Sequence, residues 1–359
     1  MTPTAAEKPT QARAHFQNLS AGKLMGLRQI TDAEGRFKVL ALDQSNSFKK
    51  ALRAMHERSG RPAEPSYEEI RDAKLEMTRL LSPLASAVLL DVNYGARQAV
   101  NSFSLPKGVG LIVRVEASKD AGIPSEYEPG WSVGQIKAMG ASAVKLLVYL
   151  DMEDTANVKA QIGFVEQVSQ ECRRHDILLM TEELSFPRKG EDKSSPSYKT
   201  RKVSNIFKAA ELLGPLTDIL KLEFPGDIHN DAEGLLKDNL AKLDGIAIRP
   251  WVLLSAGEKF DLFSKQAALA MSAGCSGYMA GRAIFNEYFE QPTPQARHAF
   301  LEGIGAGRMR ALNKIVEGKA RSWMKRYDLK VSDLAAAVAA DWYAGGKLKK
   351  TAPASSGDY

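Results

Sequence analysis

The sequence predicts an α/β fold in which eight parallel strands close into a (β/α)8 TIM barrel, with extra helices at the C-terminal end. Eight short apolar runs recur along the chain with longer amphipathic stretches between them, a pattern typical of parallel strands buried on both faces. The chain has 359 residues, a length at which such barrels fold as a single domain. An open, doubly wound sheet built from the same elements is the alternative.

The eight predicted strands are short and rich in Val, Leu, Ile and Met, and several of them end in a polar residue. In chain order they are 39–43 (VLALD), 87–91 (AVLLD), 110–115 (GLIVRV), 143–149 (AVKLLVY), 177–182 (ILLMTE), 219–223 (ILKLE), 251–255 (WVLLS) and 277–280 (GYMA).

Helices are expected between the runs, where apolar residues recur at three- and four-residue spacing. The clearest case is 67–81 (YEEIRDAKLEMTRLL), which follows Pro65. Beyond the eighth strand, 294–327 and 331–343 also have helical patterns. The Ala-rich AAAVAADWYA stretch within the second of these is suited to packing on the barrel or on a second subunit, so we expect a homo-oligomer.

The two ends of the chain differ in composition from the part between them. Residues 1–21 are rich in Thr, Pro, Ala and Gln and predict a flexible N-terminal lead, and 347–359 (KLKKTAPASSGDY) predicts a disordered tail. A single domain is expected over 22–346.

Composition points to a cytoplasmic protein. The two cysteines, Cys172 and Cys275, are too few for a disulfide framework. The N-terminal lead lacks the apolar core of a signal peptide, and no segment has the roughly 18 uncharged apolar residues that a membrane span needs. A membrane partner is therefore not expected.

A net charge of +6 is compatible with nucleic acid, a membrane surface or a phosphorylated small molecule as the partner. Nucleic acid is not expected, because basic residues are spread along the chain with one modest cluster at 188–202, and no zinc-finger or RNA-binding aromatic motif accompanies it. The five histidines form no HxH or HExxH spacing, so a metal site is not expected either. No organic cofactor is expected.

Charged residues inside apolar strands indicate where the site lies, because a buried charge is costly except at the open end of a barrel where the catalytic loops gather. Such residues occur on five of the runs. They are Asp43 and Gln44, Lys145, Glu182 and Glu183, Lys221 and Glu223, and the segment Ser255-Ala256-Gly257 that ends the seventh run. In a strand of period two, Lys221 and Glu223 share a face, so at least one of them is expected inside the barrel.

Two lysines and a carboxylate in one cavity permit nucleophilic catalysis by an amine. Burial and a neighbouring ammonium group lower the pKa of a lysine and free its lone pair for attack on a carbonyl. Lys145 can have this effect on Lys221, and Glu182 can exchange protons with the intermediates. The alternative is that the three residues form an ordinary buried salt-bridge network.

A phosphate site is expected where the seventh and eighth strands end. Small residues there, Ser255, Ala256 and Gly257 after one strand and Gly281 after the other, allow backbone N–H groups to approach an anion, and Arg282 adds a charge. The basic loop 188–202 either reaches a second anionic group of the substrate or is a solvated surface loop.

Seven segments in one order resemble the class I tagatose 1,6-bisphosphate aldolase family and its relative, the class I sulfofructose-phosphate aldolases. The resemblance covers about 24–287. Its motifs are ALDQ at 41–44, LLDVNYG at 89–95, AVKLLVYLD at 143–151, EELSF at 182–186, DILKLEFP at 218–225, LLSAG at 253–257 and AGRAIF at 280–285.

The resemblance implies an aldolase that needs no metal and uses a Schiff base. Lys221 then corresponds to the Schiff-base lysine, Glu182 to the acid/base and Lys145 to the second lysine. Asp43 and Gln44 correspond to residues at the substrate hydroxyls. Ser255, Ala256, Gly257, Gly281 and Arg282 correspond to the site for a dihydroxyacetone phosphate moiety.

The expected reaction is cleavage of tagatose 1,6-bisphosphate or a related ketose phosphate to dihydroxyacetone phosphate and glyceraldehyde 3-phosphate. Two departures leave the distal end of the substrate open. Ser45 stands where relatives usually have Arg, and the PRKGEDK stretch is closer to the sulfofructose-phosphate enzymes, which release sulfolactaldehyde. A non-catalytic sugar-phosphate sensor, or a basic nucleic-acid binder on the same scaffold, is the alternative from another class.

Overall fold

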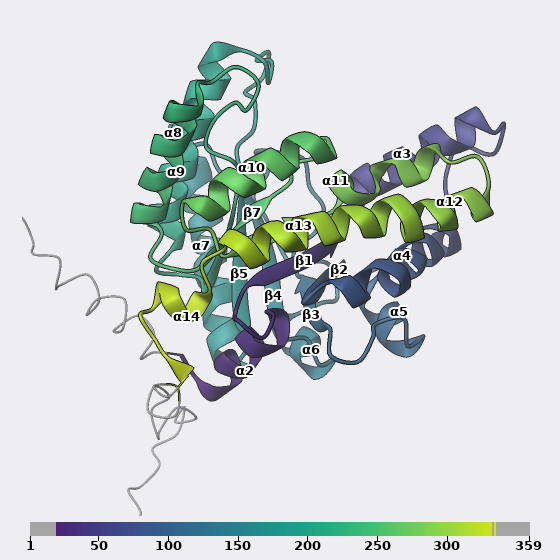
Figure 1. Cartoon of the computed structure of the whole chain (residues 1–359), viewed down its shortest axis with the longest axis horizontal. Helices are drawn as coiled ribbons and strands as arrows, with labels where there is room; N and C mark the ends of the chain where they lie inside the picture. The colour runs from purple at the N-terminus through teal and green to yellow at the C-terminus, as the bar shows by residue number, and fades with distance from the viewer. Residues whose placement is uncertain (1–18, 332–333, 335–359) are drawn as a thin grey trace, which may run out of the picture.

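Eight parallel strands close into one barrel in the computed structural model, which describes residues 19–331 and residue 334 (Figure 1). Each strand pairs with the next in the chain, and β8 pairs with β1. The predicted (β/α)8 barrel is confirmed, and the open sheet is excluded. The strands are β1 (Phe37–Leu42), β2 (Ala87–Asp91), β3 (Gly110–Arg114), β4 (Ala143–Tyr149), β5 (Leu178–Leu184), β6 (Ile219–Leu222), β7 (Trp251–Leu254) and β8 (Gly277–Ala280).

The predicted strands agree with the observed ones, and the differences at their ends have a tertiary cause. β2, β4 and β8 have the predicted bounds. β1 begins two residues earlier than predicted because Phe37 and Lys38 pair with Gly277 and Tyr278 of β8. A pairing partner 240 residues away along the chain leaves no local pattern from which a strand start can be recognised.

Helices form the outer layer of the barrel (Figure 1). α4 has the bounds predicted for it, and it begins at a capping box in which Ser66 and Glu69 exchange hydrogen bonds. The helices up to β8 are α2 (Ala21–Ile30), α3 (Asn46–Arg58), α4 (Tyr67–Leu81), α5 (Ala96–Asn101), α6 (Val133–Ala138), α7 (Thr155–Arg174), α8 (Pro196–Leu213), α9 (Glu233–Ile246) and α10 (Phe260–Ser272), with a short 3-10 turn η1 (Ser82–Leu84).

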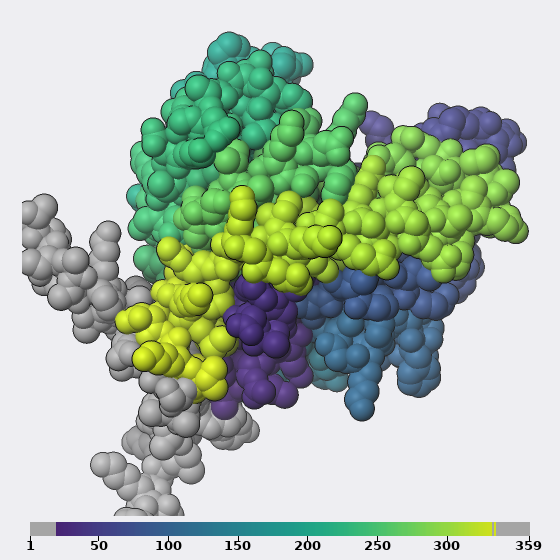
Figure 2. Space-filling view, in the orientation of Figure 1, coloured from purple at the N-terminus to yellow at the C-terminus, as the bar shows by residue number. Residues whose placement is uncertain are grey.

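The extra C-terminal helices predicted after β8 are present over the described residues. They are α11 (Arg282–Phe285), the 3-10 turn η2 (Asn286–Glu290), α12 (Pro294–Phe300), the π-helical turn η3 (Leu301–Gly305), α13 (Ala306–Lys319) and α14 (Trp323–Arg326). α12 and α13 run in line past β1 (Figure 1), and they form one ridge in the space-filling view (Figure 2). No helix in residues 19–331 is long and apolar enough to cross a membrane.

Three predicted segments lie wholly or mostly outside the described residues. They are the flexible lead, of which only 19–21 are described, the helix expected over 331–343, and the tail expected over 347–359. α2 begins at Ala21, where the lead was expected to end, and Ser20 caps it by accepting a hydrogen bond from the Lys23 N–H.

The barrel interior is apolar near the amino ends of the strands and charged near their carboxyl ends. Alternate strand residues face inward, and those nearest the amino ends form one buried cluster with α2 and the first residues of α14. Its members include Leu27, Ile30, Val39, Ala41, Leu89, Ile112, Ala143, Leu178, Met180, Ile219, Val252, Met279 and Trp323. The next position of the same alternation is charged on six strands: Asp43, Asp91, Arg114, Lys145, Glu182 and Lys221. The charges therefore gather at the carboxyl end only.

A buried ion pair outside the barrel fixes the end of β1. Lys74 of α4 and Asp91 of β2 are completely buried and in contact. The Lys74 ammonium also donates hydrogen bonds to the backbone carbonyls of Leu42 and Gln44, at 2.8 and 2.9 Å. These carbonyls flank Asp43, so α4 determines where that residue enters the barrel mouth.

Lys74→Met is expected to lower the free energy of unfolding by about 3–5 kcal/mol, because it leaves the Asp91 carboxylate buried without a counter-ion. Urea unfolding followed by circular dichroism measures the change. The control is Arg53→Met, which breaks the exposed pair of Arg53 with Glu64 and is expected to leave the urea midpoint unchanged. Equal midpoints for the two variants would contradict the assignment of Lys74 as a structural anchor.

Candidate active site

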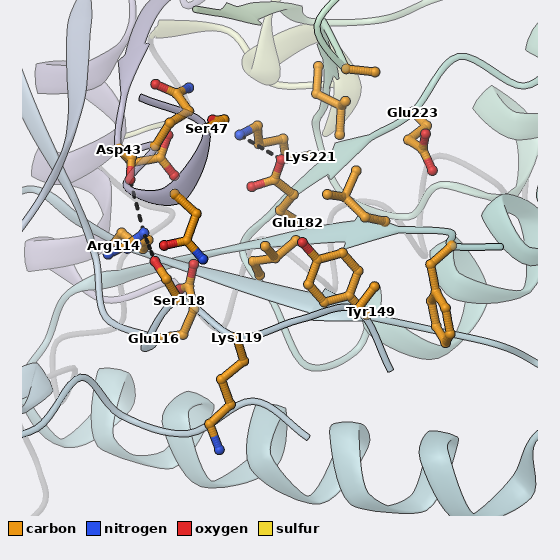
Figure 3. A pocket seen from close by; sticks show the side chains of 18 of the residues that line it. Asp43, Ser47, Arg114, Glu116, Ser118, Lys119, Tyr149, Glu182, Lys221 and Glu223 are labelled. Carbon is orange, nitrogen blue, oxygen red and sulfur yellow. Dashed lines mark hydrogen bonds and ion pairs between the residues drawn. The ribbon is translucent and has the colours of Figure 1, made fainter. Parts of the chain in front are cut away.

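A cavity of about 600 Å³ opens at the carboxyl ends of the strands. Of the residues that the sequence placed near the site, Glu183 and Gly257 do not line this cavity. The predicted residues that line it are Asp43, Gln44, Lys145, Glu182, Lys221, Glu223, Ser255, Ala256, Gly281 and Arg282. Figure 3 shows Asp43, Glu116, Tyr149, Glu182 and Lys221 around the cavity.

Glu182 joins the two active-site lysines. Its Oε1 lies 2.9 Å from the Lys221 Nζ, and its Oε2 lies 2.7 Å from the Lys145 Nζ. The three residues come from the neighbouring strands β6, β5 and β4, and each is less than a tenth exposed. The predicted convergence of these side chains is confirmed.

The two lysines keep the carboxyl group of Glu182 ionised. Burial alone would raise its pKa, but the charges of Lys145 and Lys221 outweigh burial and hold the pKa below its usual value. Lys145 shows the complementary effect, because burial opposes its charge while Asp43, Glu116 and Glu182 together raise its pKa above the ordinary lysine value. Lys145 is therefore a permanent ammonium ion at neutral pH.

Asp43 lies within the same group of charges. Its Oδ2 is 3.0 Å from the Lys145 Nζ, and Lys145, Lys221 and Arg114 hold its pKa below the usual range in spite of burial. Gln44 donates a hydrogen bond to the Ala41 carbonyl at 3.3 Å. Both residues line the cavity, as predicted.

Arg114 and Glu116 belong to the site but were not identified from the sequence. Arg114 ends β3 and donates to the Asp43 carbonyl at 3.0 Å, to the Ser118 Oγ at 2.8 Å and to the Ser45 Oγ at 3.1 Å (Figure 3). Glu116 follows β3, and its Oε1 accepts a hydrogen bond from Lys145 at 2.9 Å. The rule that found Lys145 and Glu182, a charge in or after an apolar strand, would also have found these two.

On the opposite side of the cavity, the predicted phosphate turn has the required geometry. Ala256 and Gly257 both have positive φ, of 47° and 83°, which turns the backbone sharply after β7. A Cβ atom on Gly257 would lie 2.9 Å from the Arg282 guanidinium carbon, so Arg282 packs directly on this glycine. Among the described residues, no carboxylate pairs with Arg282, so its charge is available to an anion.

The basic loop after β5 contributes one lysine to the cavity. Lys193 lines it, whereas Arg188 is paired with Asp151 and Glu153 at 2.6 and 2.8 Å. One lysine of the loop thus faces the cavity, and its contact with a second anionic group of the substrate stays a prediction.

Glu183 lies beside Glu182 in sequence but faces the other way. It is completely buried and accepts a hydrogen bond from the Ser185 hydroxyl at 2.9 Å. Burial and the nearby Glu223 raise its pKa well above the usual value. Glu183 does not line the cavity and lies outside the cluster that contacts the two lysines.

Sequence comparison places the chain among aldolases. Residues 38–287 match the sequence model of the DeoC/LacD family aldolases. A tagatose 1,6-diphosphate aldolase of Streptococcus agalactiae is 30% identical over 332 residues, which cover 86% of this chain and 99% of the relative. The enzyme of the same name from Staphylococcus aureus is 30% identical over 330 residues, covering 85% and 98%.

Structural comparison gives the same fold at low sequence identity. Fructose-bisphosphate aldolase from Plasmodium falciparum superposes with a TM-score of 0.57 at 13% identity, covering 89% of this chain and 98% of that one. A Schiff-base-forming fructose-1,6-bisphosphate aldolase superposes with a TM-score of 0.53 at 17% identity, covering 82% and 99%.

Gly257→Ala is expected to weaken the binding of inorganic phosphate roughly tenfold, because the new methyl group displaces Arg282 and removes a charge-assisted hydrogen bond worth about 1.5–3 kcal/mol. Isothermal titration calorimetry measures the affinity. Gly190→Ala is the matched control, since Gly190 has a φ of 81° but open space where its Cβ would lie. Equal phosphate affinity in both variants would exclude Gly257 and Arg282 from the anion site.

Proposed function

The chain belongs to the DeoC/LacD family of aldolases, and on this premise we propose that it is a class I aldolase in which Lys221 forms a Schiff base with a ketose 1,6-bisphosphate. One observation carries the proposal: Lys221 is a buried amine at the wall of the cavity, with the ionised Glu182 2.9 Å away. The substrate is tagatose 1,6-bisphosphate, after the names of the relatives. The products are dihydroxyacetone phosphate and glyceraldehyde 3-phosphate.

Catalysis begins when Lys221 passes a proton to Glu182, 2.9 Å away, and its Nζ attacks the C2 carbonyl carbon to form a carbinolamine. Glu182 exchanges protons with the carbinolamine oxygen, so that this oxygen leaves as water and an iminium ion remains. The contact of Glu182 with Lys221 supports this role, because proton transfer requires hydrogen-bond distance.

Cleavage of the C3–C4 bond follows. The bonding electrons move into the iminium, which becomes an enamine, while the C4 hydroxyl gives its proton to Glu182 and becomes the aldehyde. Asp43 lies 3.0 Å from Lys145 and lines the cavity, which supports its assignment to the substrate hydroxyls. Protonation of the enamine at C3 and hydrolysis of the iminium then release dihydroxyacetone phosphate and restore Lys221.

The phosphate on C1 is assigned to the turn Ser255-Ala256-Gly257 together with Gly281 and Arg282. The unpaired guanidinium of Arg282 and the positive φ angles of the turn support this assignment. Lys193 is the residue of the basic loop that lines the cavity, and we assign it to the distal phosphate.

We further infer a cytoplasmic enzyme that forms homo-oligomers and needs no cofactor. Both cysteines are buried free thiols, which supports a reducing compartment. The reaction as written needs only protein side chains and water. The oligomer is inferred from the apolar C-terminal sequence, and light scattering measures it.

The Schiff base is tested by borohydride reduction in the presence of dihydroxyacetone phosphate. A reduced adduct is expected on Lys221 alone, identified by peptide mass spectrometry, and it is expected to be unchanged by prior treatment with a chelator. Lys221→Met is expected to abolish the adduct. An adduct on no lysine of the unmutated protein would contradict the class I mechanism and favour a sugar-phosphate sensor.

Glu182→Gln is expected to lower kcat for aldol cleavage by about 10²–10⁴-fold, because the amide cannot exchange protons with the carbinolamine. Steady-state kinetics with tagatose 1,6-bisphosphate measures the loss. Glu183→Gln is the matched control on the same strand, and it is expected to keep near-normal kcat because Glu183 faces away from the cavity and contacts neither lysine. Similar losses in both variants would point to a general disturbance of β5 instead.

A further inference from the structure

The cavity holds two lysine amines, and only one of them can serve as the nucleophile at a time. Their surroundings differ. The Lys145 Nζ lies within 3.0 Å of three carboxylates, those of Asp43, Glu116 and Glu182. The Lys221 Nζ has an ion pair with Glu182 alone among the described residues.

We propose that Glu116 is a positioning residue that keeps Lys145 an ammonium ion, so that the substrate forms its covalent adduct on Lys221 and not on Lys145. The inference rests on the Schiff-base mechanism proposed above. It adds a selection between two amines that the family assignment does not contain.

The number of N–H groups makes this selection stringent. An ammonium ion has three N–H donors and no lone pair, and Lys145 has one carboxylate oxygen for each donor, at 3.0, 2.9 and 2.7 Å. A neutral amine in this position would have to direct its lone pair at a carboxylate oxygen. The arrangement therefore stabilises the charged, unreactive form.

Glu116 differs from the other two carboxylates in having no second partner. Glu182 is shared with Lys221, and Asp43 is placed to meet the substrate hydroxyls. The Oε1 of Glu116 contacts Lys145, and its Oε2 is buried and has no hydrogen-bond partner in the described part of the chain. The residue is 3% exposed, so Lys145 is the group that compensates its charge.

Glu116 supplies one of the three carboxylates that face Lys145. Asp43 follows β1, Glu116 follows β3 and Glu182 lies on β5, while the neighbouring cations are Arg114 at the end of β3 and Lys221 on β6. Arg114 has a further carboxylate partner, Glu128, at 3.7 Å. Without the charge of Glu116, Lys145 keeps two carboxylates and shares one of them, Glu182, with Lys221. Loss of the Lys145 proton therefore costs less in a variant that lacks this charge.

Glu116→Gln tests the proposal, because the amide keeps the size and an acceptor oxygen but removes the charge. The variant is treated with dihydroxyacetone phosphate and borohydride between about pH 6 and pH 9, a range below the ordinary lysine pKa, and adducts are located by peptide mass spectrometry. The expected result is that an adduct appears on Lys145, at least about tenfold more abundant than in the unmutated protein, which corresponds to a pKa lower by one unit. Glu116→Asp, which keeps the charge, is expected to leave the adduct on Lys221.

Glu223→Gln is the matched control. Glu223 is also buried and lines the same cavity, but its carboxylate pairs with Lys202 at 3.1 Å. The adduct of this variant is expected on Lys221 alone. An adduct confined to Lys221 in Glu116→Gln throughout the pH range overturns the proposal, as does an equal adduct on Lys145 in both Gln variants.

A second measurement covers the case in which Glu116→Gln does not fold. In the unmutated protein, trace reductive methylation is expected to leave Lys145 unlabelled at a pH where exposed lysines react. Lys145 is expected to stay unlabelled even when the concentration of the methylating reagent is raised until Lys221 is labelled. Labelling of Lys145 together with Lys221 overturns the proposal. Absence of any dihydroxyacetone phosphate adduct on the unmutated protein, with Lys145 still unlabelled, overturns the Schiff-base mechanism and leaves the protection of Lys145 established.

Discussion

The balance of buried charge at the mouth of the barrel is the constraint on which the site depends. Asp43, Glu116 and Glu182 surround Lys145 there, with Arg114 and Lys221 beside them, and an unpaired charge buried in such a place costs several kcal/mol. Each side chain is therefore fixed by its neighbours as well as by its strand. Glu182 shows this most clearly, because each of its oxygens contacts a different lysine.

The backbone around this cluster is held by two cations, Lys74 from the outer helix α4 and Arg114 from the end of β3. Lys74 donates hydrogen bonds to the carbonyls of Leu42 and Gln44. Arg114 donates one to the carbonyl between them, that of Asp43. Two buried cations on separate elements thereby fix three successive carbonyls at the end of β1. Catalysis by orientation requires that reacting groups are held rigidly, because small displacements of such a group reduce the rate strongly.

The cavity brings together the groups that the proposed reaction of a ketose phosphate needs. The turn proposed for the phosphate lies after β7 and β8, and the strands on its two sides are β6, which carries Lys221, and β1, which ends beside Asp43. Glu182 and Lys145 follow on β5 and β4. The family assignment and the arrangement of these side chains support the same chemistry.

The sequence by itself determined the barrel, the eight strands and most of the cavity lining. Alternation of apolar residues has a fixed period of two, and parallel strands end at one edge, so Lys145, Glu182 and Lys221 had to meet there. The same rule also covers Arg114 and Glu116, whereas the tertiary structure alone decided which oxygen each lysine contacts and brought Lys74 of α4 to the end of β1. Those contacts depend on the stagger of neighbouring strands and on helix packing, which join residues far apart in the chain and leave no periodic pattern in the sequence.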